Sequence, residues 1–159
     1  MLDLLIRGAS VVDGTGGAAR ICDIGVRDGR MVLQTEGRKA SHEIDATNLV
    51  LSPGFIDVHG HSDLFAFLDP LRSSKLCQGI TTEIAGQCGI SPAPMHPDFL
   101  DQYRGYYQSL GAPIHPEVEQ LTSVGALLDI LEAQHMGIHL AMFTAQGSLR
   151  IAAMGLAPR

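Results

Sequence analysis

The chain has 159 residues, 45% of them hydrophobic, so it can bury a sizeable core. Its net charge of −6 and its two lysines argue against nucleic acid as a partner, and its apolar runs are too short to cross a bilayer. The N-terminus lacks a signal-peptide pattern and the three cysteines have no paired spacing, so a reducing, cytoplasmic location is expected.

Residues 1–52 are predicted to form a β-rich first domain. Turn-forming residues separate the short apolar runs, and Asp28-Gly29 is typical of a tight hairpin. The expected strands are Leu4–Val12, Ile21–Val26, Arg30–Gln34, Glu43–Ala46 and Leu49–Leu51. These strands are too few to close a core alone, so we expect a small sheet that is completed by other parts of the protein.

From Pro53 the pattern changes to alternating strands and helices, which predicts an α/β fold with a parallel sheet over residues 53–159. The expected strands are Phe55–His59, Thr81–Gln87 and Ile138–Phe143. The expected helices are Asp69–Gln78, ended by Gly79, then Pro97–Leu110 and Ser123–Gln134, the last capped by Ser123. A further helix begins near Gly147, and we expect the chain to be part of a longer protein.

His59 and His61 follow the apolar start of the first strand of this second domain. Side chains two residues apart on a strand point to the same face, so both imidazoles can approach one metal ion. Most His-x-His pairs are ordinary histidines, but this pair lies where a strand gives way to a loop. Because that end of the strand carries the chemistry in parallel α/β folds, the position favours a metal site.

Cys88 lies at the end of the next strand and directly precedes Gly89. A lone cysteine is more often a small buried apolar residue than a ligand. If the two strands are neighbours, however, their ends meet, and a thiolate beside two imidazoles is a typical zinc-binding set. From the residues alone, His59, His61 and Cys88 would make a zinc site if the fold brings them together, and the reading of Cys88 as a small buried residue stays open.

Asp57 and Asp63 are the acidic residues closest to this pair. Asp57 shares the strand parity of the histidines, so it either orients an imidazole N–H or is a buried carboxylate bonded to the backbone. Asp63 has the same supporting role or caps a helix, and the cap is favoured. Glu83 is unusual inside an apolar strand, and the sequence assigns it no role. His139, at a strand start, is predicted to be structural, and the remaining histidines to be solvent-exposed: His42, His96, His115 and His135.

At two motifs the chain resembles the amidohydrolase superfamily, in its N-acyl-D-amino-acid deacylase (D-aminoacylase) branch. The segment from Pro53 to His61 resembles the first barrel strand, and Gly79 to Pro94 is similar to the second-strand motif in which a cysteine is a metal ligand. The resemblance implies the N-terminal part of a (β/α)₈ TIM-like barrel, preceded by part of a small β-sandwich. Both parts would be incomplete within this chain.

The same resemblance implies what the site does. His59, His61 and Cys88 would bind one or two zinc ions, and the full-length enzyme would release a D-amino acid from a small-molecule N-acyl-D-amino acid. The acid/base aspartate is expected beyond Arg159, so no catalytic residue other than the ligands is expected here. Two positions depart from the pattern: Gln87 stands where the branch has asparagine, and Gln146 stands where many relatives have histidine.

Two alternatives stay open at this point. The fold can serve another amidohydrolase, acting on a cyclic amide or a dipeptide. Alternatively, the 159-residue chain is catalytically incomplete and inactive alone, in which case its unpaired sheet edges would favour self-association.

Overall fold

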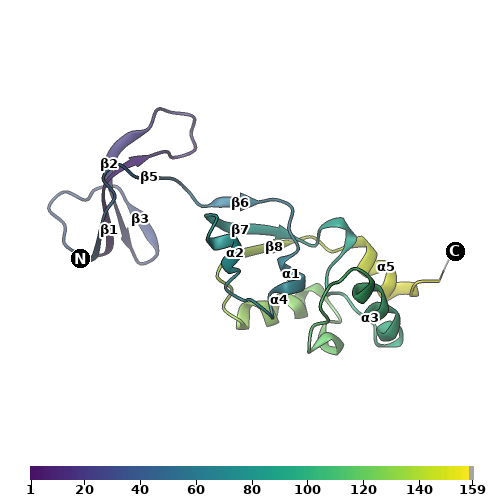
Figure 1. Cartoon of the computed structure of the whole chain (residues 1–159). Helices are drawn as coiled ribbons and strands as arrows, with labels where there is room; N and C mark the ends of the chain where they lie inside the picture. Colours follow the sequence, from purple (N-terminus) through teal and green to yellow (C-terminus); the bar gives the residue numbers. More distant parts are fainter. Residues whose placement is uncertain (158–159) are drawn as a thin grey trace. The chain divides into compact units, whose positions relative to one another are not determined.

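The computed structural model describes residues 1–157 and divides into two compact units, Met1–Pro53 and Gly54–Arg159, each with its own sheet (Figure 1). None of the helices within residues 1–157 combines the length and the apolar character that a membrane-spanning segment requires.

The first unit is a five-stranded sheet in the order β3-β2-β1-β4, with β5 also paired to β1. The strands are β1 Leu2–Val11, β2 Arg20–Arg27, β3 Arg30–Val32, β4 Ala40–Asp45 and β5 Val50–Leu51. Both residues of the β2–β3 turn, Asp28 and Gly29, have positive φ, at 52° and 70°, so the predicted tight hairpin is confirmed. Ala9, Val11, Ile24 and Ala46 form the small core.

Part of this sheet leaves its apolar side chains uncovered within the unit. An open depression of about 650 Å³ is lined mainly by apolar residues, among them Ile6, Ile24 and Leu51. Met31 and Leu33 at its border are 67% and 70% exposed. The unit therefore has apolar surface that its own residues do not bury.

The second unit contains a three-stranded parallel sheet in the order β6-β7-β8. Its strands are β6 Phe55–Asp57, β7 Ile80–Ala85 and β8 His139–Met142. The α-helices are α1 Ser62–Phe65, α2 Ser73–Leu76, α3 Leu100–Ser109, α4 Val124–Ala133 and α5 Gln146–Met154. The 3-10 turns are η1 Gln87–Gly89, η2 Pro97–Phe99 and η3 Val118–Gln120. Figure 1 shows α1, α2 and α4 along one side of the sheet, so the predicted alternation of parallel strands and helices is confirmed.

Several predicted elements differ in extent from the observed ones, and two of these differences bear on the site. The first strand ends at Asp57 rather than His59, so both histidines lie in the following loop. The predicted helix Asp69–Gln78 shrinks to α2, because Arg72 adopts a left-handed backbone with φ 51° immediately before it. Gly79, with φ 77°, ends the segment as predicted.

The predicted start of α4 is confirmed in detail. The Ser123 hydroxyl accepts a hydrogen bond of 3.1 Å from the Ala126 N–H, as an N-cap should. Leu127 and Leu131 on the buried face of α4 pack with Ala66, Ala93 and other apolar residues of the sheet side. This packing fixes the helix against the segments that follow β6 and β7.

A buried polar cluster joins α3, α5 and the segment after β7. Tyr107, Ser91 and Ser148 are each at most 1% exposed. The Tyr107 hydroxyl lies 2.6 Å from the Ser91 carbonyl oxygen and 2.8 Å from the Ser148 hydroxyl, and it accepts from the Ser91 N–H at 3.0 Å. These bonds fix α5 and α3 to the chain that leaves η1.

Tyr107→Phe is expected to lower the free energy of unfolding by about 1–3 kcal/mol, because it leaves the Ser91 and Ser148 groups with fewer partners in a buried place. Urea denaturation measures the change. Tyr106→Phe is the matched control, since the Tyr106 hydroxyl makes no hydrogen bond within residues 1–157 and its loss should be nearly neutral. Equal effects of the two substitutions would contradict the role given to the cluster.

Candidate metal centre

His59 and His61 are held in the loop after β6 by backbone hydrogen bonds. The Asp57 carboxylate accepts from the His59 N–H at 3.1 Å, and the Gly60 N–H donates to the Ile84 carbonyl of β7 at 3.2 Å. The two rings stand edge to face with centroids 5.8 Å apart. The two rings are thus neighbours because the loop is anchored. Strand parity does not align them, since both histidines lie beyond the end of β6.

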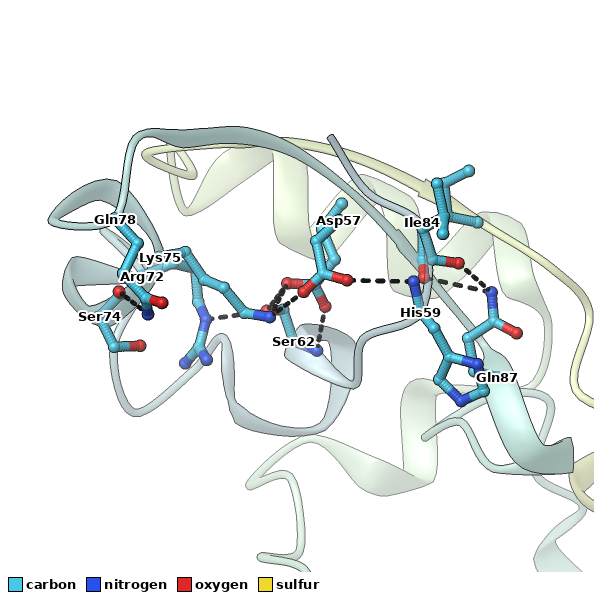
Figure 2. A network of polar contacts seen from close by, with 11 residues as sticks. Asp57, His59, Ser62, Arg72, Ser74, Lys75, Gln78, Ile84 and Gln87 are labelled. Atoms are coloured by element: carbon cyan, nitrogen blue, oxygen red, sulfur yellow. Dashed lines mark hydrogen bonds and ion pairs between the residues drawn. The ribbon is translucent and has the colours of Figure 1, made fainter. Parts of the chain in front are cut away.

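Cys88 is presented by the tight turn η1 that follows β7. Its backbone is left-handed, with φ 55°, and the flanking Gly86 and Gly89 also have positive φ. The Gln87 side-chain amide donates to the Val58 carbonyl at 2.9 Å, which ties this turn to the histidine loop. The same amide lies 3.4 Å from the Ile84 carbonyl oxygen of β7 (Figure 2). Gln87, which stands where the deacylase branch has asparagine, therefore holds the Cys88 turn against the histidine loop.

The three predicted ligands come together. The His59 Nε2 lies 3.1 Å from the Cys88 Sγ, and one donor atom from each of His59, His61 and Cys88 lies within 4.8 Å of the others. Tetrahedral zinc with bonds of about 2.0–2.3 Å places its ligand atoms about 3.5 Å apart. His59 and Cys88 are exposed and His61 is half-buried, so the group is open to a ligand from solution. Two imidazoles and a thiol suit zinc and leave further coordination positions free.

Asp57 does not hydrogen-bond either imidazole ring. Its carboxylate bonds the His59 main-chain N–H and forms an ion pair with Lys75, as Figure 2 shows. The hydrogen bond from Lys75, followed by the one from the His59 N–H, lowers the pKa of Asp57 below its ordinary value. Of the two alternatives for Asp57, the structure shows the carboxylate bonded to the backbone.

The prediction that Asp63 is a helix cap is wrong. α1 begins at Ser62 with His61 in the N-cap position, so Asp63 lies in the first turn, 1% exposed. Neither carboxylate oxygen has a hydrogen-bond partner among residues 1–157. Burial raises the pKa of the Asp63 carboxyl to about 6.

His115 was expected to be solvent-exposed and is instead 5% exposed. Its ring packs edge-on against Phe67 with centroids 4.9 Å apart, and its Nδ1 accepts from the Glu117 N–H at 3.0 Å. Burial lowers the pKa of His115. The other three histidines predicted to be solvent-exposed are exposed: His42, His96 and His135. His139 is the exposed first residue of β8 and lies at the end of the sheet opposite Cys88.

Glu83 is the residue whose role the sequence did not assign. Its side chain is fully buried, and its oxygens accept from the Ser62 N–H at 2.8 Å and the Ser62 hydroxyl at 2.6 Å. The Lys75 ammonium lies 3.2 Å from the same carboxylate, and the Arg72 Nε donates to the Ser62 hydroxyl at 3.0 Å. The only signal in the sequence was an acidic residue in the middle of an apolar strand.

Gln146, the other departure, is the exposed first residue of α5. The following residue, Gly147, lies against the Cys88 turn, since a Cβ there would be 2.5 Å from the Gly89 carbonyl oxygen. Gln146 therefore belongs to a segment that borders the turn.

The sequence and structure comparisons with known proteins agree on one family. The sequence profile of the amidohydrolase family matches residues 42–125. The N-acyl-D-glutamate deacylase of Alcaligenes xylosoxydans xylosoxydans is 34% identical over an alignment 157 positions long, which covers 96% of this chain. The crystal structure of N-acyl-D-glutamate deacylase from Bordetella bronchiseptica, complexed with zinc and a phosphonate inhibitor, superposes with a TM-score of 0.80 at 37% identity over 96% of this chain. A D-aminoacylase with a binuclear metal centre superposes with a TM-score of 0.79 at 30% identity over 97% of it.

The chain spans only about a third of the length of these relatives: 30% of the Alcaligenes protein, 31% of the Bordetella structure and 32% of the D-aminoacylase structure. The likeness therefore concerns the N-terminal portion of such enzymes.

Proposed function

The chain belongs to the amidohydrolase family, and from that membership we propose that it is the N-terminal part of a zinc-dependent enzyme that releases D-amino acids from N-acyl-D-amino acids. The observation that carries the proposal is the approach of His59, His61 and Cys88 to within 4.8 Å of one another. The names of the relatives support the substrate class, and the zinc in the Bordetella structure supports the metal.

In this proposal the described residues bind the metal and orient the side chains that hold it. His59, His61 and Cys88 hold one or two zinc ions, with Cys88 as a thiolate. When bound, zinc supplies Lewis-acid polarisation of the amide carbonyl and activation of a water molecule. Gln87 and Asp57 hold the two loops that carry the ligands. The ligand group contains no carboxylate that could serve as the acid/base residue, and the chain spans about a third of its relatives' length, so we expect the 159-residue chain to be inactive alone and the acid/base aspartate to come from the rest of the enzyme.

We further propose that β6, β7 and β8 are the first strands of a (β/α)₈ barrel and that residues 1–52 are part of a β-sandwich. Both edges of the three-stranded sheet, β6 and β8, lack a neighbouring strand within residues 1–157. Phe55, Ile56 and Phe143 there are 61%, 62% and 59% exposed. The isolated chain should therefore self-associate, whereas later strands would cover these edges in the full-length protein.

The full-length protein is expected to hydrolyse N-acetyl-D-glutamate, N-acetyl-D-aspartate or N-acetyl-D-methionine faster than hydantoin, and to lose this activity after treatment with a zinc chelator. Release of the free amino acid, measured with each D and L substrate, checks the proposal. The L enantiomers and a dipeptide are the controls for substrate class. Preferential turnover of hydantoin or of the dipeptide would support another amidohydrolase activity and contradict the deacylase proposal.

A further inference from the structure

We propose that Glu83 is a positioning residue of the metal centre: from the buried side of the sheet it holds the segment Asp57–Ser62 in the conformation that presents both histidines to Cys88. This inference rests on the proposed metal site and adds a residue to it. Glu83 does not reach the ligand atoms, so it acts through the main chain on which they are carried.

The first support is the set of bonds at the C-terminal end of the histidine segment. Ser62 directly follows His61, and both its N–H and its hydroxyl donate to the Glu83 carboxylate, at 2.8 and 2.6 Å. The carboxylate is 0% exposed, and its third partner is the Lys75 ammonium at 3.2 Å. A buried carboxylate without such partners is strongly unfavourable, so Ser62 is held where Glu83 requires it.

The second support lies at the other end of the same segment. Lys75 bridges Glu83 to Asp57, and the other oxygen of Asp57 accepts from the His59 N–H at 3.1 Å. Figure 2 shows this chain of contacts running from Lys75 to Asp57 and on to His59. Glu83 is thereby connected to the main chain on both sides of the His-Gly-His sequence.

The third support is the contact in the middle. A Cβ added to Gly60 would lie 2.1 Å from the Glu83 Oε1 and 2.3 Å from its carboxyl carbon. The main chain between the two histidines thus passes directly over the carboxylate, and only glycine fits there. Glu83 therefore contacts the histidine segment directly at Gly60 and Ser62, and it is linked indirectly to His59 through Lys75 and Asp57.

The test uses Co²⁺ as the probe, added to the metal-free full-length protein. Co²⁺ affinity and the thiolate-to-cobalt charge-transfer and ligand-field absorption bands report the site independently of activity. Glu83→Ala is expected to weaken Co²⁺ binding about 10–100-fold and to shift the ligand-field bands, as loss of a ligand-supporting partner does elsewhere. Glu83→Gln keeps one acceptor oxygen for Ser62, replaces the other with an NH2 donor and loses the charge, so it should fall between this variant and the wild type.

Gly60→Ala provides a second measurement, because its effect on Co²⁺ affinity should depend on whether Glu83 is present. In the wild-type background it should impair Co²⁺ binding, because the new methyl group meets the carboxylate. In the Glu83→Ala background the same substitution should have a much smaller effect, because the group that it meets is gone. Tyr107→Phe is the control for general destabilisation: it weakens the same unit but should leave the Co²⁺ affinity and spectrum unchanged.

The outcomes separate the two levels of the proposal. If the wild type binds Co²⁺ with a thiolate band and folded Glu83→Ala is identical to it, the positioning role is overturned while the metal site stands. If Glu83→Ala does not fold, Glu83→Gln decides, and an unchanged affinity and spectrum in that variant overturns the role. If the wild type itself shows no thiolate band, the metal site falls and the role of Glu83 falls with it.

Discussion

Cys88→Ala is expected to abolish stoichiometric zinc binding and to reduce the deacylase activity of the full-length protein by roughly a thousandfold, since Lewis-acid assistance is worth several kcal/mol of transition-state stabilisation. The thiol is the one sulfur donor of the group and lies 3.1 Å from the His59 Nε2. Because Cys88 is exposed and alanine has a similar backbone preference, the melting temperature of the metal-free protein should change little.

Zinc content after dialysis and the rate of D-amino acid release measure this effect, and circular dichroism tests whether the variant is folded. Cys77→Ala is the matched control, because Cys77 is an exposed cysteine of the same unit at the end of α2, outside the ligand group. Near-wild-type zinc content and turnover in folded Cys88→Ala would remove the proposed centre. A comparable loss in Cys77→Ala would show that the effect is not specific to the site.

Gly86→Ala is expected to lower the free energy of unfolding by about 3 kcal/mol and to displace Cys88. Gly86 has φ 72°, a left-handed conformation that costs an alanine about 1–2 kcal/mol. Its new Cβ would also lie 2.1 Å from the Phe143 carbonyl oxygen at the end of β8. Relief of that contact requires the ends of β7 and β8 to separate, which adds a cost of similar size.

Thermal or urea denaturation, together with zinc content, measures the consequence of Gly86→Ala. Gly105→Ala is the control of opposite sign: Gly105 is exposed within α3, and a Cβ there meets nothing within 4 Å. Alanine should raise stability at that position by about 0.5–1 kcal/mol. Equal stability of the Gly86→Ala variant and the wild type would contradict the close approach of β7 and β8 at the Cys88 turn.

The sequence was sufficient to predict the parts of the site that depend on local order. Strands followed by turn residues locate His59, His61 and Cys88 near strand ends, and parallel pairing brings strand ends to one edge. The Ser123 cap and the Asp28-Gly29 turn were predictable for the same reason, because their hydrogen bonds form between residues close in sequence.

What the sequence could not predict depends on contacts between distant residues. The bonds of Glu83 join β7 to Ser62 and Lys75, and no local sequence pattern predicts them. His115 looked polar and exposed, but the apolar surroundings that bury it include Phe67, 48 positions earlier in the numbering. The length of the helix before β7 was overestimated because the left-handed backbone at Arg72 breaks a pattern that is otherwise helical.

The placement of the histidines after β6, rather than on it, has a consequence for how the site tolerates change. On a strand, a slip of one residue in pairing turns every side chain to the opposite face. The β6–β7 ladder already contains such an irregularity, between Phe55 and Ile56. Because the imidazoles are carried on a loop that Glu83 of β7 contacts at Gly60 and Ser62, the face to which they point does not follow from the β6 register. A shift of β6 along β7 would act on them mainly through Asp57, the last residue of β6.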